Sequence, residues 1–338
     1  MRKQDAGFLK VAGVSVAAAL AWAVAEPASA ACEPVGEIRF ICDLVSPEDF
    51  AIVPGDEWVI ASGDREGGRI QLVHVRDKTA TAVFPAPGAA ERLDAATYPT
   101  CPGPIDPDEG DEFRAHGLYL RTSDGNVHTL YVVHHGLRES IEVFEVDTAG
   151  TQPVLTWVGC AVAPDPLSLN AVVATPEGGF VTTSPGTDDV WEWHTDSGWE
   201  RVPGSEGTTP NGLEISSDGQ WLYIAGWWEE KLTRLSRGRT PLQKDVVDMG
   251  FRPDNLRMSA DRSFIFAAGH GNVREPRDLP NETSNVAKVD PQTLEVRRIF
   301  QHPHIDDFGG STTAVQIGGE MWLGTYRGTM IAYLPAPE

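Results

Sequence analysis

The sequence is poor in basic residues. Its 338 residues include 27 Lys and Arg against 49 Asp and Glu, for a formal net charge of −22. Nucleic acids and anionic lipid surfaces are bound through basic surfaces, so this composition argues against both as partners, and it is compatible with binding a hard cation. The chain also lacks a Gly-x-Ser-x-Gly motif and a phosphate-binding loop. These absences disfavour a serine hydrolase and a nucleotide-binding enzyme.

No segment after the N-terminal 30 residues approaches membrane-spanning length. Residues 1–30 combine a basic start at Arg2 and Lys3, an apolar run over 11–24 and a final Ala-Ser-Ala triplet. This pattern is typical of a secretory signal peptide, and its apolar run is short for a stable span. We therefore expect export to the periplasm or the medium, with residues 31–338 as the mature chain. An uncleaved anchor is the alternative.

Cysteines are few: Cys32, Cys42, Cys101 and Cys160. No two of them have the C-x-x-C spacing, so cysteine is not expected to bind a metal. In an oxidising compartment four cysteines allow three pairings. Proximity and loop context favour Cys32–Cys42 and Cys101–Cys160.

Helical periodicity is almost absent after residue 31. Short segments rich in Val, Ile, Tyr, Trp and Phe alternate with Gly, Pro, Asp and Asn, which indicates an all-β protein. The segments recur as six pairs, which we interpret as the inner and middle strands of a repeat of about 51 residues. The pairs are 57–63 with 69–75, 129–135 with 140–146, 179–183 with 189–193, 221–225 with 231–235, 264–268 with 285–289, and 320–324 with 329–333.

This period predicts a six-bladed β-propeller formed by residues 31–338 as a single domain. Two β-sandwich domains are the alternative, but they would need a linker that the composition does not suggest. Because a ring of blades must be closed, we expect the strand 37–41 to join the sheet of the last blade.

Polar residues recur at one place in each repeat, before the inner strand, where six segments would surround one mouth of the central channel. The segments are 47–50, 115–118, 169–172, 210–213, 253–256 and 310–313. A single Asn-Gly or Pro-Asp pair is ordinary turn chemistry, but recurrence at equivalent positions favours a shared function.

These segments supply an all-oxygen set of metal ligands, with two carboxylates and three amides: Glu48, Asn170, Asn211, Asp254 and Asn255. Hard oxygen ligands of mixed charge suit Ca2+, which takes roughly six to eight of them, with water or substrate completing the shell. Zn2+ would favour His or Cys, and Mg2+ prefers fewer protein ligands.

At this point the chain resembles the paraoxonases, which are calcium-dependent arylesterases and lactonases, and more remotely the gluconolactonase and regucalcin group. The similarity covers most of residues 31–338, and the order and spacing of its short segments make the joint match specific. The segments are Pro47-Glu48-Asp49, His116-Gly117, Val132–His135 with Ser140–Phe144, Leu169-Asn170, Asn211–Gly219, Asp254-Asn255, and Gly310–Ala314 with Leu323–Thr325.

The resemblance implies that the five oxygen ligands hold a catalytic calcium and that His116 and His135 match the family's histidine pair. Because adjacent side chains of a strand alternate, only one of His134 and His135 can face the channel. The implied function is a calcium-dependent lactonase with arylesterase activity on a small-molecule lactone or ester. Calcium would polarise the carbonyl while the histidine pair activates water.

The chain departs from the paraoxonase pattern at two site positions. Ala171 stands where the family has Asp, so the second, structural calcium that Asp49 would share is expected to be absent or altered. Pro185 lies near the position of the acidic residue that orients the family's histidine pair.

Two other functions stay open. One is a gluconolactonase-type sugar lactonase that uses the metal without the histidine pair. The other is a non-catalytic, ligand-binding propeller, because this fold hosts many functions. Trp227 and Trp228 could line an apolar substrate pocket, although packing between blades is the favoured role for such aromatics.

Overall fold

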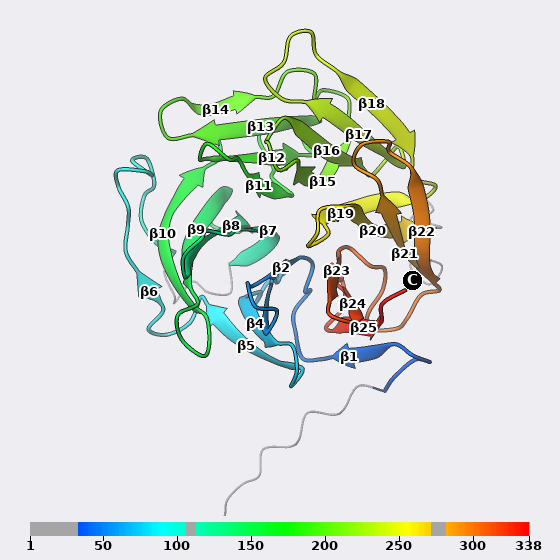
Figure 1. Ribbon diagram of the computed structural model, residues 1–338. Helices are drawn as coiled ribbons and strands as arrows, with labels where there is room; N and C mark the ends of the chain where they lie inside the picture. Colours follow the sequence, from blue (N-terminus) through cyan, green and yellow to red (C-terminus); the bar gives the residue numbers. More distant parts are fainter. Residues whose placement is uncertain (1–32, 106–112, 272–281, 338) are drawn as a thin grey trace, which may run out of the picture. The chain divides into compact units, whose positions relative to one another are not determined.

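Six small sheets, packed around a common axis, make up the part of the chain that the computed structural model describes, residues 33–105, 113–271 and 282–337 (Figure 1). These residues contain no helix, and the arrangement is the six-bladed β-propeller that the sequence predicts. From the innermost strand outward, the first sheet consists of β2 (Phe50–Ile52), β3 (Trp58–Ala61), β4 (Ile70–His74) and β5 (Thr79–Phe84), and the second of β7 (Arg114–Arg121), β8 (Val127–His135), β9 (Ser140–Asp147), β10 (Val154–Val162) and β6 (Ala90–Glu91). The third sheet consists of β11 (Val172–Ala174), β12 (Phe180–Ser184), β13 (Asp189–His194) and β14 (Gly198–Arg201), and the fourth of β15 (Pro210–Ile215), β16 (Trp221–Gly226), β17 (Lys231–Ser236) and β18 (Lys244–Asp248). The fifth sheet consists of β19 (Arg252–Met258), β20 (Ile265–Gly271), β21 (Thr283–Val289) and β22 (Val296–His302), and the sixth of β23 (Ala314–Ile317), β24 (Glu320–Leu323), β25 (Ile331–Pro335) and β1 (Arg39–Ile41).

All six predicted strand pairs exist, but their assignment as inner and middle strands is wrong by one position. They are the second and third strands of each sheet, as in β3 with β4 and β16 with β17. The innermost strands are β2, β7, β11, β15, β19 and β23, which contact one another around the axis. They are short or interrupted by polar residues, so they lack the alternation by which a strand is recognised in a sequence.

The ring is closed by the two ends of the chain. β1 pairs with β25, with Arg39 opposite Tyr333 and Ile41 opposite Ile331, which confirms the predicted place of the strand at 37–41. Trp322 of β24 is fully buried and packs in one cluster with Ile41 and with Phe50 of β2. Backbone pairing of β1 therefore completes the last sheet, and apolar burial packs that sheet against the first.

One of the two favoured disulfides is confirmed: Cys101 is bonded to Cys160 of β10. A disulfide is consistent with an exported protein. The pairing of Cys42 with Cys32, and the signal peptide over 1–30, involve residues outside the described part and stay predictions. Among the described residues, no helix is long and apolar enough to cross a membrane.

Replacing both Cys101 and Cys160 with Ser should lower the free energy of unfolding by about 2–4 kcal/mol. The bond joins residues 59 positions apart, so its loss releases a large loop in the unfolded chain. Urea unfolding under non-reducing conditions measures the change. Equal stability of variant and parent would contradict a restraining role for this cross-link.

Candidate active site

Bulges in three innermost strands turn polar side chains toward the axis. The pairing register shifts between Ala115 and Leu118 in β7, and at the equivalent places in β15 and β19. A bulge leaves residues unpaired and re-aims their side chains. The residues at the three shifts are His116, Asn211, Asp254 and Asn255, while Glu48 and Asn170 lie just before β2 and β11.

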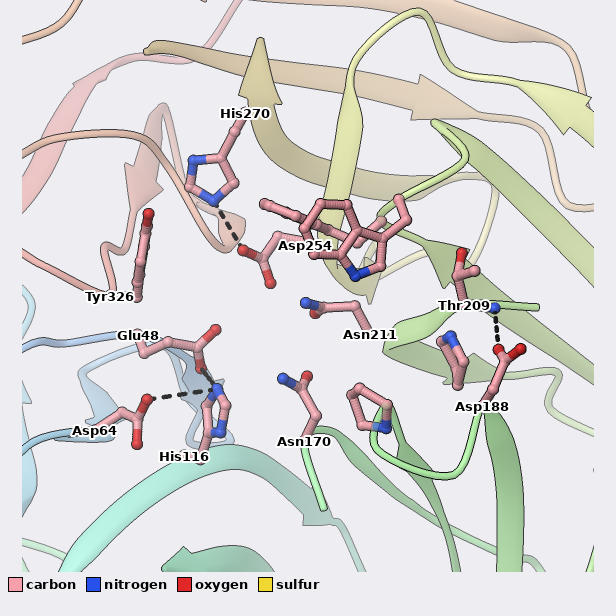
Figure 2. A pocket seen from close by; sticks show the side chains of 14 residues that line it. Glu48, Asp64, His116, Asn170, Asp188, Thr209, Asn211, Asp254, His270 and Tyr326 are labelled. Atoms are coloured by element: carbon pink, nitrogen blue, oxygen red, sulfur yellow. Dashed lines mark hydrogen bonds and ion pairs between the residues drawn. The ribbon is translucent and has the colours of Figure 1, made fainter. Parts of the chain in front are cut away.

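A cavity of about 440 Å³ lies where these residues meet (Figure 2). Four of the five predicted metal ligands line it, and so does His116. The complete lining is Glu48, Asp64, His116, Asn170, Pro185, Asp188, Thr209, Pro210, Asn211, Trp227, Trp228, Asp254, His270 and Tyr326. Asn255 and His135 stand behind this wall, each hydrogen-bonded to a residue within it.

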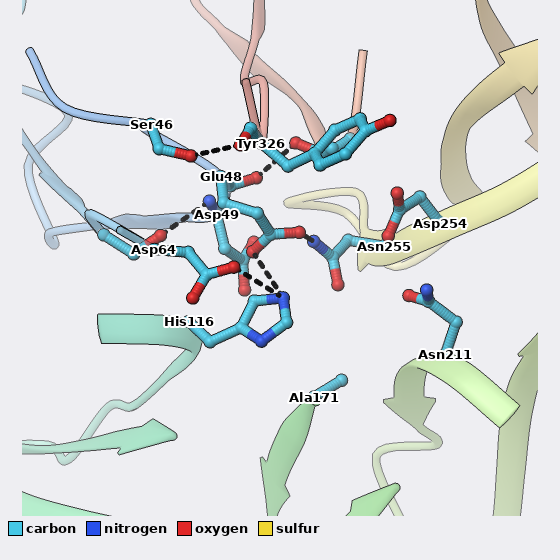
Figure 3. A network of polar contacts seen from close by, with 12 residues as sticks. Ser46, Glu48, Asp49, Asp64, His116, Ala171, Asn211, Asp254, Asn255 and Tyr326 are labelled. Atoms are coloured by element: carbon cyan, nitrogen blue, oxygen red, sulfur yellow. Dashed lines mark hydrogen bonds and ion pairs between the residues drawn. The ribbon is translucent and has the colours of Figure 1, made fainter. Parts of the chain in front are cut away.

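Four of the predicted ligands present a buried oxygen without a hydrogen-bond partner. These atoms are Glu48 Oε2, Asn170 Oδ1, Asn211 Oδ1 and Asn255 Oδ1. The Asn255 amide nitrogen donates to Glu48 Oε1 at 2.5 Å, which leaves its carbonyl oxygen available (Figure 3). Each unpartnered buried oxygen costs about 1–3 kcal/mol. Four such atoms from four sheets, three on side chains that line the cavity and one on Asn255 behind them, fit a divalent cation of hard character.

Glu48 lies in a buried environment with a concentration of negative charge. This side chain is 1 % exposed. Burial, and then the carboxylates of Asp49, Asp254 and Asp64, raise the pKa of Glu48 well above its usual range. A cation among these oxygens would favour the ionised form of Glu48.

Asp64, His116 and His135 form a second group whose ligand atoms all lie within 4.8 Å of one another. A metal ion there would compete with an existing contact, because His116 Nδ1 and His135 Nε2 are hydrogen-bonded at 2.9 Å. The oxygens of the first group have no such competing partner, so they are the better candidate metal site.

Asp49 does not fit a second metal. Its Oδ2 accepts hydrogen bonds from the backbone N–H of Leu118 at 2.7 Å and from the guanidinium of Arg257. Arg257 also donates to the backbone oxygens of Phe50, Leu256 and Leu118. Arg257 is thus the positive charge that neutralises Asp49. The absence or alteration of a second, structural calcium stays a prediction.

The side chains of the two predicted histidines are hydrogen-bonded to each other, and the carboxylate of Glu139 fixes which ring nitrogen of His135 carries the proton. His135 Nδ1 lies 2.8 Å from Glu139 Oε2, so His135 donates there and accepts from His116 Nδ1 through its other nitrogen. His116 Nε2 then carries a lone pair into the cavity, 3.7 Å from Asp64 and 3.9 Å from Glu48. Burial lowers the pKa of His116, which favours the neutral ring.

The neighbouring His134 points the other way, as strand alternation predicts. It is fully buried, and its ring lies 4.8 Å from the ring of Phe113. Burial lowers the pKa of His134 to about 4, so it is a neutral core residue.

His270 is a site residue that sequence analysis missed. It is 1 % exposed and lies between two carboxylates, with Nε2 2.8 Å from Asp254 and Nδ1 2.9 Å from Glu282. Burial lowers its pKa, but the hydrogen bonds to Asp254 and Glu282 outweigh that effect and raise the pKa of His270 to about 9. The imidazolium therefore orients Asp254. Asp254 is 16 residues distant in the chain, and no local motif signals the contact.

Comparison with solved structures identifies proteins of the same architecture. A luciferin-regenerating enzyme is 12 % identical, with a TM-score of 0.56, over 90 % of this chain and 96 % of that one. A putative gluconolactonase is 16 % identical, with a TM-score of 0.55, over 89 % and 93 %. A gluconolactonase from Xanthomonas campestris is also 16 % identical, with a TM-score of 0.55, over 89 % of both chains.

The shared feature is the fold. At these identities the comparison supports the six-bladed propeller and does not determine the reaction. A scan against models of protein families found no match, and neither did a search of curated proteins.

Proposed function

We propose that the protein is an exported, calcium-dependent hydrolase of lactones and esters, of the paraoxonase type. The supporting observation is the position of the four unpartnered oxygens. Three of them belong to side chains that line the cavity into which His116 directs a ring nitrogen (Figure 2), and the fourth, on Asn255, lies behind its wall. An ester hydrolase needs an electrophile for the carbonyl oxygen and a base for water at one place.

The proposed calcium ligands are Glu48, Asn170, Asn211, Asp254 and Asn255. When bound, calcium supplies Lewis-acid polarisation of the substrate's carbonyl oxygen. Asn255 and His270 hold the two carboxylates of this set, through Glu48 Oε1 and Asp254 Oδ2. Both carboxylates therefore keep one oxygen available for the ion.

His116 is the proposed general base. Its Nε2 accepts a proton from water as the water oxygen bonds to the carbonyl carbon. The positive charge that develops on His116 is stabilised by Asp64 and, through His135, by Glu139. His116 then returns the proton to the departing oxygen as the acyl–oxygen bond breaks. A lactone gives a hydroxy acid, and an ester gives an acid and an alcohol.

Apolar side chains favour an aromatic or aliphatic substrate. Pro185, Pro210, Trp227 and Trp228 line the cavity together with the polar groups. Trp228 is 58 % exposed, so its side chain is accessible to a substrate that enters the cavity.

Chelation of divalent ions should abolish turnover of phenyl acetate and of a long-chain lactone, and added Ca2+ should restore it. The His116→Gln variant should lose roughly 100-fold or more in kcat, while His302→Gln, on β22, serves as the control. Loss on chelation without a His116 effect, with gluconolactone as the best substrate, would favour the sugar lactonase. No turnover of any of these substrates would favour a binding protein.

A further inference from the structure

Glu139, in the turn between β8 and β9, uses both of its carboxylate oxygens. Oε2 lies 2.8 Å from His135 Nδ1, and Oε1 accepts the backbone N–H of Leu169 at 2.5 Å. Leu169 directly precedes Asn170, which directs an unpartnered oxygen into the cavity. One side chain therefore contacts the histidine pair and the segment that carries a proposed calcium ligand.

The contacts of Glu139 belong to a closed ring. From Glu139 they pass through His135 to His116, whose neighbour Gly117 donates its backbone N–H to Asn170 O at 3.1 Å. The ring returns through Leu169 to Glu139. A side chain at Gly117 would collide with the backbone of Asn170, so the two segments are in close contact. Glu139 is the side chain of this ring that contacts both the histidine pair and the Leu169 segment.

The turn that carries Glu139 is held rigidly by its neighbours. Arg138 forms two hydrogen bonds of 2.8 Å with Glu142, which is fully buried. Glu142 also accepts from Ser140 at 2.6 Å and from the indole N–H of Trp157 at 2.8 Å. The backbone oxygen of Glu139 accepts from Ala163 at 2.9 Å. Hydrogen bonds to buried groups thus hold the turn that carries the Glu139 carboxylate in place.

We propose that Glu139 is a positioning residue that couples the cation site to the histidine pair. It keeps the proton of His135 on Nδ1, so that His135 Nε2 can accept from His116, and it holds the segment that presents Asn170. This inference rests on the proposed function. It gives Glu139 the role of the acid that orients the histidine pair, a residue that the resemblance to the paraoxonases did not identify. Because Glu139 contacts both parts of the site, a change at Glu139 affects ion affinity as well as turnover.

The Glu139→Gln variant tests the proposal, because glutamine has the same shape but only one acceptor atom for two N–H donors. We expect calorimetry to show calcium affinity about tenfold weaker, and kcat to fall at least about tenfold with little change in KM. If the glutamine oxygen stays on Leu169, its amide donates to His135. The 15N spectrum of His135 would then change from the Nδ1–H to the Nε2–H tautomer.

Two matched variants isolate the role of the carboxylate. Glu145 lies on the adjacent strand β9 and is 40 % exposed beside Arg92, so Glu145→Gln should leave all three measurements unchanged. The His135→Gln variant should lower kcat without weakening calcium binding, because His135 does not contact the Leu169 segment through any described hydrogen bond.

Parental calcium affinity together with an unchanged His135 tautomer in Glu139→Gln would overturn the proposal, because one glutamine oxygen cannot accept from both Leu169 and His135. If the parent hydrolyses no ester, the proposed function fails, yet calorimetry and the 15N spectrum still decide the role of Glu139. If Glu139→Gln does not fold, Glu139→Asp is measured instead. Its shorter side chain cannot reach both donors, so parental affinity and tautomer in that variant would overturn the proposal.

Discussion

Replacing Glu48 with Gln should abolish calcium binding at the channel mouth and lower ester hydrolysis roughly 100-fold or more. Glutamine keeps the volume of Glu48 and can still accept the amide hydrogen bond from Asn255, so the fold should be retained. The variant removes one of two carboxylates from the proposed ligand set. Isothermal calorimetry with Ca2+ and the phenyl acetate assay measure the two effects.

Without calcium, the Glu48→Gln variant should lose no stability relative to the parent. The folded-state pKa of Glu48 is raised by burial and by neighbouring carboxylates, so the folded state of the parent binds more protons than the unfolded chain. The stability of the metal-free parent therefore falls as pH rises from the ordinary range of a glutamate through that raised pKa. The Glu48→Gln variant lacks this loss and should be at least as stable at neutral pH.

The exposed Glu57 gives a control, because Glu57→Gln removes the same charge without touching the cavity. Calcium should raise the melting temperature of the parent and of this control, but not of Glu48→Gln, since a ligand stabilises only the state that binds it. Parental calcium affinity in Glu48→Gln would remove Glu48 from the ligand set.

Replacing Arg257 with Met should destabilise the fold by about 3–5 kcal/mol. Arg257 is 9 % exposed, and Asp49 beside it is fully buried. Removing the guanidinium leaves that carboxylate without its counter-charge and also leaves the backbone oxygens of Phe50 and Leu118 without a donor. Equilibrium unfolding in urea, analysed for the midpoint and the slope, measures the loss.

Two further variants show whether the charge pair accounts for this loss. Arg257→Met combined with Asp49→Asn removes both charges and should recover part of the stability. Arg76→Met removes an arginine that is 84 % exposed and should change stability by less than about 0.5 kcal/mol. Parental stability in Arg257→Met would contradict the counter-charge role. Because Arg257 neutralises Asp49, calorimetry of the parent should give one calcium ion per chain.

The second and third strands of each sheet could be predicted because both of their faces are buried. Val59 and Ile60 of β3 and Leu222 and Ile224 of β16 are fully buried, so these segments appear as apolar runs between turn residues. The innermost strands could not be recognised in this way. In β7, β15 and β19 the register shifts at the polar residues that face the axis, and the apolar alternation is interrupted there.

The oxygen-bearing residues of the candidate site could be predicted because four of the six repeats supply them at equivalent positions. Glu139 and His270 could not, since their partners lie on other strands or other sheets. Glu139 contacts Leu169 of the next sheet, and His270 contacts Glu282 across an intervening segment. Such side-chain contacts leave no periodic signal in the chain.

The amino-acid sequence by itself determined the architecture of this protein, because strand patterning and the repeat length are local properties that each sheet expresses independently. It also determined which residue types reach the channel mouth. Only the tertiary structure decided how charge is balanced there. Arg257 neutralises Asp49, while one oxygen of Glu48 and three amide oxygens have no hydrogen-bond partner among the described residues. Charge balance depends on which groups from different sheets come within a few ångströms, and that distance is set by the closure of the ring.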